Sequence, residues 1–223
     1  VEIMGRHAGW LTAASSLARK FPGDNPVLIY LPETDFNPEL FLESVAKTLE
    51  TTPNLVVCIS EGIHDENGTF ICELAGDVGI DAFGHKMLTG SGKYLENLVK
   101  NHLGVKVRSI ELNVCQRCSS AMLSATDQKE AIASGAYGVK CALDGETGKM
   151  IAFRRIHNEP YTVDYVTADV NVVCNREKAV PPDWITKAGT DVSDKFLAYA
   201  KPLIQGQVNI PFENGLPKFA YRK

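Results

Sequence analysis

The segment VEIMGRHAGW, residues 1–10, decides how this sequence is interpreted. Val1 to Met4 form the end of a predicted β-strand, and apolar residues at helical spacing predict a helix from Leu11 to Phe21. Gly5 and Arg6 lie between the two. Glycine lets a ligand approach the backbone, and an arginine at a helix start suits phosphate or sugar hydroxyls. On spacing alone, Arg6 is also compatible with a solvated side chain.

Outward from this segment, apolar runs typical of buried strands alternate with amphipathic helical patterns. Pro38 follows Asn37, a suitable helix cap, and Gly62–Gly92 is a glycine-rich stretch that we expect to run over the surface. Strands or extended segments are predicted at 27–31, 55–59, 106–112, 150–156 and 161–173, and further helices at 38–49, 94–103, 127–143 and 196–204.

This alternation indicates an α/β fold, because parallel strands need helical crossovers between them. We expect a mostly parallel sheet that is covered by helices on both faces. Val1 begins inside a strand, so we expect the fold to be incomplete at its N-terminus. The predicted division is an α/β domain over residues 1–113 and a C-terminal segment, with a terminal helix, over residues 114–223.

Ligands of such sheets bind beyond the carboxyl ends of the strands. The residues there are Gly5-Arg6, Pro32-Glu33, Ser60-Glu61-Gly62 and Gln116-Arg117. Glu61 could accept hydrogen bonds from sugar hydroxyls, or be an ordinary acidic loop residue. Arg108 and Arg117 could bind one phosphate, in one subunit or across an interface, or be solvated arginines.

Composition excludes several classes of protein. A formal net charge of -4 argues against a nucleic-acid binder, and no apolar run is long enough to span a membrane. No signal peptide is visible, and the six cysteines indicate reduced thiols, so we expect a cytoplasmic protein. Cys115 and Cys118 lack a second pair of metal ligands, so no metal site is predicted in this chain.

The motif Met4-Gly5-Arg6-x-x-Gly9 resembles the fructose-6-phosphate signature of the 6-phosphofructokinase family. The family's order of motifs continues with Ser60-Glu61 after a strand, then a strand with Arg108, and then Gln116-Arg117 nine residues on. A helix that starts at Asp127 follows. The resemblance covers most of the chain to about residue 156, and the later residues more loosely.

The resemblance implies a role for each of these residues. Met4, Gly5 and Arg6 would line the fructose-6-phosphate pocket, Glu61 would bond sugar hydroxyls, and Arg117 would contact the 6-phosphate. Arg108 would come from a neighbouring subunit, which implies a homo-oligomer, either a dimer or a tetramer. Mg²⁺ would be the cofactor, held mainly by residues outside this chain.

Several segments resemble the pyrophosphate-dependent branch of the family more than the bacterial ATP-dependent enzymes. They are residues 7–10, 60–62, 81–85 and 124–127. Two positions depart from the family pattern: Val114 stands where the family has His or Tyr, and Ala121 where relatives often carry His. We expect these departures to make sugar binding weaker or to change its arrangement.

In this family the phosphoryl-donor loop and the catalytic Thr-x-Asp segment precede the Met-Gly-Arg motif. The resemblance therefore implies the acceptor-binding half of a glycolytic phosphofructokinase, with pyrophosphate as donor and no catalytic residue in this chain. Two alternatives stay open. One is an ATP-dependent phosphofructokinase, and the other is a non-catalytic sugar-phosphate-binding or regulatory subunit.

Overall fold

The computed structural model describes residues 1–75 and 90–218. The predicted family segment at residues 81–85 lies outside them. The chain separates into two compact units. The first comprises Val1–Gln116 with Glu177–Leu197, and the second comprises Arg117–Arg176 with Ala198–Lys223. None of the described helices combines the length and apolar character needed to cross a membrane.

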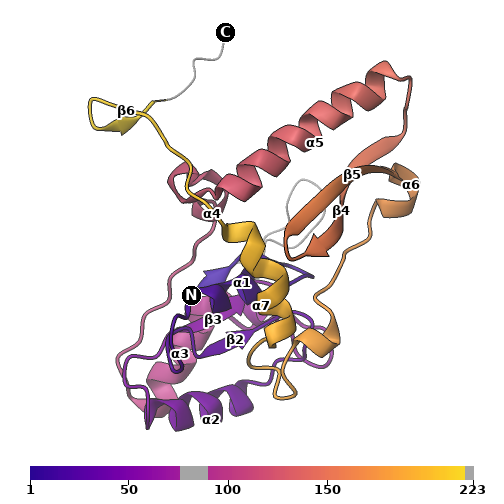
Figure 1. Cartoon of the computed structure of the whole chain (residues 1–223). Helices are drawn as coiled ribbons and strands as arrows, with labels where there is room; N and C mark the ends of the chain where they lie inside the picture. Colours follow the sequence, from indigo (N-terminus) through magenta and orange to yellow (C-terminus); the bar gives the residue numbers. More distant parts are fainter. Residues whose placement is uncertain (76–89, 219–223) are drawn as a thin grey trace. The chain divides into compact units, whose positions relative to one another are not determined.

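The first unit is built on a three-stranded parallel sheet (Figure 1). Its strands are β1 (Glu2–Ile3), β2 (Leu28–Tyr30) and β3 (Val57–Ser60), in the order β1-β3-β2. Its helical elements are α1 (Trp10–Ala14), α2 (Pro38–Leu49) and α3 (Ser91–Leu103), with shorter 3-10 turns η1 (Ser15–Ala18), η2 (Ile71–Ala75) and η4 (Pro182–Trp184).

Successive side chains of each strand point to opposite faces of the sheet, and both faces carry apolar side chains. Leu28, Tyr30 and Ile59 join one core cluster with Phe41 and Val45 of α2 and with residues of α3. The intervening residues Ile29, Leu31 and Cys58 are also buried, and α1 contacts β2 and β3. The predicted parallel sheet with helices on both faces is therefore confirmed.

The second unit consists mainly of a long helix and a hairpin. The helix is α5 (Ala125–Leu143), and the antiparallel hairpin is formed by β4 (Lys149–Asn158) and β5 (Tyr161–Asp169). Shorter elements complete the unit, namely η3 (Ser120–Met122), α6 (Val170–Val173), η5 (Lys201–Ile204), β6 (Phe212–Glu213) and β7 (Leu216–Pro217). Two short helices cross the boundary between the units, α4 (Cys115–Cys118) and α7 (Asp194–Ala200).

Local hydrogen bonds explain where the helices begin. Asn37 Oδ1 accepts from the backbone N–H groups of Glu39 and Leu40 at 2.8 and 3.0 Å, which confirms the predicted cap of α2. Helix α5 begins two residues earlier than predicted, because Ser124 is its cap and accepts from Asp127 N at 3.1 Å.

Three sequence-based predictions were wrong in extent. The helix predicted to reach Phe21 ends as α1 at Ala14, followed by η1. The hydroxyls of Ser15 and Ser16 donate to Thr12 O and Ala13 O at 2.6 Å, which competes with helical hydrogen bonds. The extended segment predicted to reach Val173 turns into α6, because Asp169 accepts from Asn171 N at 2.9 Å and caps it.

The third was the strand predicted over residues 106–112. It makes a single bridge, between Glu111 and Glu2. Its neighbour β1 is only two residues long. Glu2 of β1 donates from its N–H to Ile110 O at 2.8 Å and accepts at its carbonyl oxygen from Leu112 N at 3.0 Å. The short β1 therefore pairs with only a small part of the predicted strand.

Candidate functional site

The three parallel strands bring their carboxyl ends to one edge of the sheet. Residues Met4–Gly9 follow β1, Glu61 and Gly62 follow β3, and Glu33 follows β2 after two buried residues. Parallel sheets bind ligands at this edge. The sequence-based list of residues after each strand therefore describes neighbours in space.

The loops after β1 and β3 are joined by backbone and side-chain hydrogen bonds. Gly5 N donates to Glu61 Oε1 at 3.3 Å, and Gly62 N donates to Gly5 O at 3.3 Å. The Ser60 hydroxyl also donates to Gly5 O. The structure thus brings together four of the predicted site residues, Met4, Gly5, Arg6 and Glu61.

Glycine at position 62 is a requirement of this close approach. A Cβ atom there would lie 1.8 Å from the backbone oxygen of Arg6, far inside van der Waals contact. The loop that carries Arg6 and the loop that carries Glu61 are therefore packed backbone to backbone. A spacing argument from sequence identified Gly62 but gave no reason for it.

Two further residues hold the Met4–Gly9 loop, and the sequence-based site did not include them. Glu33 Oε1 accepts from Gly9 N at 2.9 Å, and Gln116 Oε1 accepts from Met4 N at 3.4 Å. The carboxyl-end rule pointed to both residues, because each follows a predicted strand. The family resemblance gave neither of them a role, so they were left out.

The strand before the Met4–Gly9 loop, β1, carries a buried carboxylate. Glu2 of β1 is 4% exposed and accepts from Gly92 N, in the first turn of α3, at 2.7 Å. Burial raises the pKa of the Glu2 carboxyl, the Gly92 N–H opposes the rise, and the negative charges of Glu111 and Glu61 add to it. The protonation of the Glu2 carboxyl is therefore coupled to the charge of Glu61.

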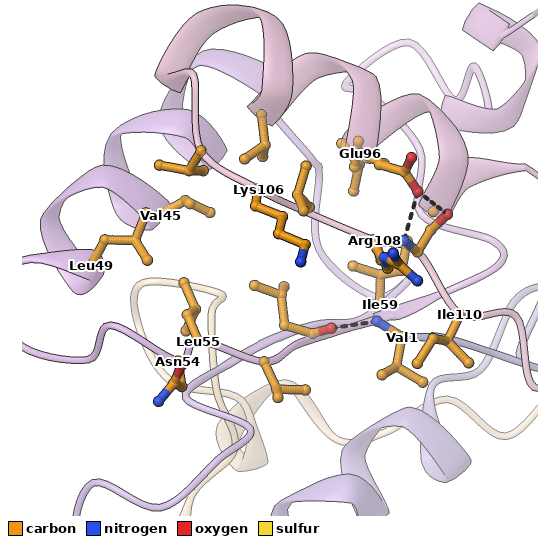
Figure 2. A pocket seen from close by; sticks show the side chains of 18 of the residues that line it. Val1, Val45, Leu49, Asn54, Leu55, Ile59, Glu96, Lys106, Arg108 and Ile110 are labelled. Carbon is orange, nitrogen blue, oxygen red and sulfur yellow. Dashed lines mark hydrogen bonds between the residues drawn. The ribbon is translucent and has the colours of Figure 1, made fainter.

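The two arginines predicted from the motif order, Arg108 and Arg117, belong to different compact units. Arg117 is an exposed residue of α4 and belongs to the second compact unit. Arg108 is exposed in the first unit, where it lines an apolar groove together with Val1 and Val57 (Figure 2). Neither observation tests the role that the resemblance implies for them.

The groove has a volume of about 680 Å³ and lies at the amino ends of β1 and β3. Its walls come from α2, α3, the residues before β3, and the segment that contains Lys106 and Arg108 (Figure 2). Glu96 holds that segment, since it accepts from the backbone N–H and the hydroxyl of Ser109, both at 2.7 Å. Hydrogen bonds from Lys93 and Ser109 lower the pKa of Glu96 to about 2.

The described residues do not supply a metal site. Within residues 1–75 and 90–218, no three His, Cys, Asp or Glu side chains gather closely enough to hold an ion. The part of the chain described thus lacks a set of donors for the Mg²⁺ that the family resemblance implies.

Comparison with known proteins identifies the family of this chain. The family model described as phosphofructokinase matches residues 1–142. The pyrophosphate–fructose 6-phosphate 1-phosphotransferase of Halomonas elongata is 40% identical over 220 residues, which cover 99% of this chain and 52% of that protein. The protein of the same name from Xanthomonas campestris pv. campestris is 37% identical and is matched over 100% of this chain and 53% of its own length.

A solved structure supports the same assignment. The pyrophosphate-dependent phosphofructokinase from Marinobacter aquaeolei superposes with a TM-score of 0.83 at 34% identity, covering 97% of this chain and 50% of that one. The chain thus spans about half the length of the relatives it matches. The match of the family model over residues 1–142, together with the shared fold, shows that this chain belongs to the phosphofructokinase family.

Proposed function

We propose that this chain is the acceptor-binding half of a phosphofructokinase that transfers a phosphoryl group from pyrophosphate to the 1-hydroxyl of fructose 6-phosphate. The observation that carries the proposal is the convergence of the Met4-Gly5-Arg6 loop and Glu61 at the carboxyl edge of the parallel sheet, in a chain of this family. The complete protein would act in glycolysis in the cytoplasm.

The chemistry of the clustered residues suits the acceptor sugar phosphate. Arg6 offers a planar set of donors for phosphate or hydroxyl oxygens, and the Glu61 carboxylate accepts hydrogen bonds from sugar hydroxyls. We assign the 6-phosphate to Arg117, and Arg108 to the site of a neighbouring subunit in a dimer or tetramer. In this proposal residues 1–113 form the sugar-phosphate domain, and residues 114–223 return towards the donor-binding domain.

Phosphoryl transfer depends on positioning and on stabilising the charge of the transferred group. This chain supplies the positioning of the acceptor. The donor site, the Mg²⁺ ligands and the base that activates the 1-hydroxyl are assigned to residues outside it, in keeping with a chain that spans about half of its relatives. We therefore expect the isolated chain to be inactive.

Steady-state kinetics of the full-length enzyme test the assignment of Arg117. Replacing Arg117 by Ala removes a charged donor, so the Michaelis constant for fructose 6-phosphate should rise about 10- to 100-fold, while that for pyrophosphate changes little. Arg154→Ala is the matched control, because Arg154 is 62% exposed and forms a surface ion pair with Asp164 at 3.1 Å. Unchanged constants in Arg117→Ala would show that its assigned role is wrong.

The same assay separates the two remaining candidates. Turnover with ATP in place of pyrophosphate would identify an ATP-dependent enzyme. Two features favour a non-catalytic subunit, Val114 and Ala121. Val114 is 61% exposed at a position where the resemblance implies His or Tyr. Binding of fructose 6-phosphate without turnover by either donor would support that candidate and contradict the proposed enzyme.

A further inference from the structure

The loop that carries Arg6 is held at both of its ends by carboxylates. At its amino end, Gly5 N donates to Glu61 Oε1 at 3.3 Å. At its carboxyl end, Gly9 N donates to Glu33 Oε1 at 2.9 Å. The bond to Glu33 is the shorter one, and a backbone N–H that donates to a carboxylate forms a charge-assisted hydrogen bond. The position of Arg6 therefore depends on Glu33, which follows a different strand, β2.

Glu33 also joins this loop to a segment far away in the sequence. Its Oε1 atom accepts a second hydrogen bond, from Val180 N at 2.8 Å, across 147 residues. Val180 is fully buried. One carboxylate oxygen thus connects the end of β2, the Gly5–Gly9 loop and the segment Glu177–Leu197, all within the first compact unit.

The packing beside this carboxylate leaves no room for a side chain at position 9. A Cβ atom at Gly9 would lie 2.8 Å from Glu33 Oε2, 2.8 Å from Pro32 Cδ and 2.9 Å from Leu31 Cδ2. Glu33 Oε2 is itself buried, and no hydrogen-bond partner for it occurs among the residues described. Burying an incompletely paired carboxylate costs free energy, which favours a specific role over a chance arrangement.

We infer that Glu33 is a positioning residue for acceptor binding. It fixes the carboxyl end of the Gly5–Gly9 loop against the Val180 backbone, and so sets where Arg6 is presented at the edge of the sheet. This inference rests on the proposed function for its link to fructose 6-phosphate, whereas the anchoring of the loop stands on the hydrogen bonds alone.

The segment Glu177–Leu197 has other attachments that do not involve the loop, and these provide a control. Arg19 forms a bidentate ion pair with Asp191, with both N–O distances at 2.9 Å. Ile29 N of β2 donates to Thr190 O at 2.8 Å. Removing the Arg19 side chain weakens the same segment without touching Glu33 or Gly9.

The test compares three variants of the full-length enzyme. Glu33→Ala removes the acceptor of Gly9 N, Glu33→Gln keeps a carbonyl acceptor of the same length, and Arg19→Gln is the control. In Glu33→Ala the Michaelis constant for fructose 6-phosphate should rise about 10- to 100-fold, with kcat and the pyrophosphate constant within about threefold. Glu33→Gln should stay within about threefold of the parent enzyme, because its amide oxygen still accepts. Arg19→Gln should change none of the three.

Hydrogen exchange of the Gly9 and Val180 amides in the same proteins gives a readout independent of turnover. Both should exchange at least about tenfold faster in Glu33→Ala, and at the parent rate in Glu33→Gln. An unchanged constant for fructose 6-phosphate, or equal effects of Glu33→Ala and Arg19→Gln, would overturn the inference. If the parent enzyme does not turn over fructose 6-phosphate, the proposed function fails. The exchange rates then decide whether Glu33 anchors the loop.

Discussion

The two ends of the central sheet differ in chemistry, although the same three strands form both. At the carboxyl ends, glycines, carboxylates and backbone N–H groups of three loops are hydrogen-bonded to one another. At the amino ends of β1 and β3, a groove of about 680 Å³ is lined mainly by apolar side chains of α2, α3 and the neighbouring segments. The proposed ligand site and the apolar groove are thus separated along the strand direction.

Our proposal for the acceptor site rests on the chemistry of these two ends and not on cavity size. The groove has a volume of about 680 Å³, but its charged side chains are few: Lys106, Arg108 and Glu96, with Glu96 already bonded to Ser109 and Lys93. The carboxyl ends gather backbone N–H groups and carboxylates of three loops around the Met4–Gly9 segment that carries Arg6. Recognition of a sugar phosphate requires such groups, so we place binding at the carboxyl ends.

The largest expected effect concerns the apolar side of this comparison. Phe41 is 3% exposed, and its ring centroid lies 5.5 Å from that of Tyr30 and 5.4 Å from that of Phe36. Phe41→Ala should lower the free energy of unfolding by about 3–5 kcal/mol, measured by urea denaturation. Leu40→Ala, at a 60% exposed position of the same helix, is the control and should cost less than about 1 kcal/mol. Equal losses would mean that α2 is not packed as described.

An intermediate effect is expected on the polar side. Gly62→Ala places a methyl group 1.8 Å from Arg6 O, so the two loops must move apart. The free energy of unfolding should fall by about 1–3 kcal/mol, and the Michaelis constant of the full-length enzyme for fructose 6-phosphate should rise at least about tenfold. Gly135→Ala is a suitable control, since a Cβ atom there meets nothing within 4 Å and alanine favours the helix. Unchanged kinetics in Gly62→Ala would remove the Arg6 loop from the acceptor site.

The smallest effect concerns Glu2, whose carboxylate lies between the two regions. Its pKa is raised in the folded state, so its ionisation costs stability, and that cost grows as the pH rises from about 4.5 through the raised value. Glu2→Gln keeps an oxygen acceptor for Gly92 N and should stabilise the chain at pH 8, where the Glu2 carboxylate is ionised. The gain should shrink at pH 5. A gain that is equal at both pH values would contradict a raised pKa.

Local sequence patterns predicted most of the fold. Asn37-Pro38 and Ser124 carry helix-start chemistry in their own side chains, and the runs before Leu31 and Ser60 are apolar enough to indicate buried strands. Two errors had local causes, the hydroxyls of Ser15 and Ser16 and the cap at Asp169. The third arose where a neighbour in space decides the outcome. Residues 106–112 alternate like a strand, but the number of strand residues depends on the length of β1 beside them.

The candidate site could be predicted in part. Gly5, Arg6 and Glu61 follow strands, so the rule for parallel sheets placed them on one edge, and the hydrogen bond from Gly5 N to Glu61 Oε1 agrees with it. Glu33 satisfied the same rule, but nothing in its local sequence shows that its carboxylate accepts from Gly9 and Val180. The relation of Arg117 to these residues stays a prediction, because it belongs to the second unit.

Sequence alone is enough to establish the alternation of strands and helices, the residues that follow each strand, and membership of the phosphofructokinase family. These properties depend on hydrophobic periodicity and on residue types at short spacing, which the chain carries locally. Only the tertiary structure decided that Gly62 must lack a side chain, that Glu33 bridges Gly9 and Val180, and that Arg108 lies in an apolar groove. Those outcomes depend on the packing of segments that are up to 147 residues apart, and no local pattern encodes such distances.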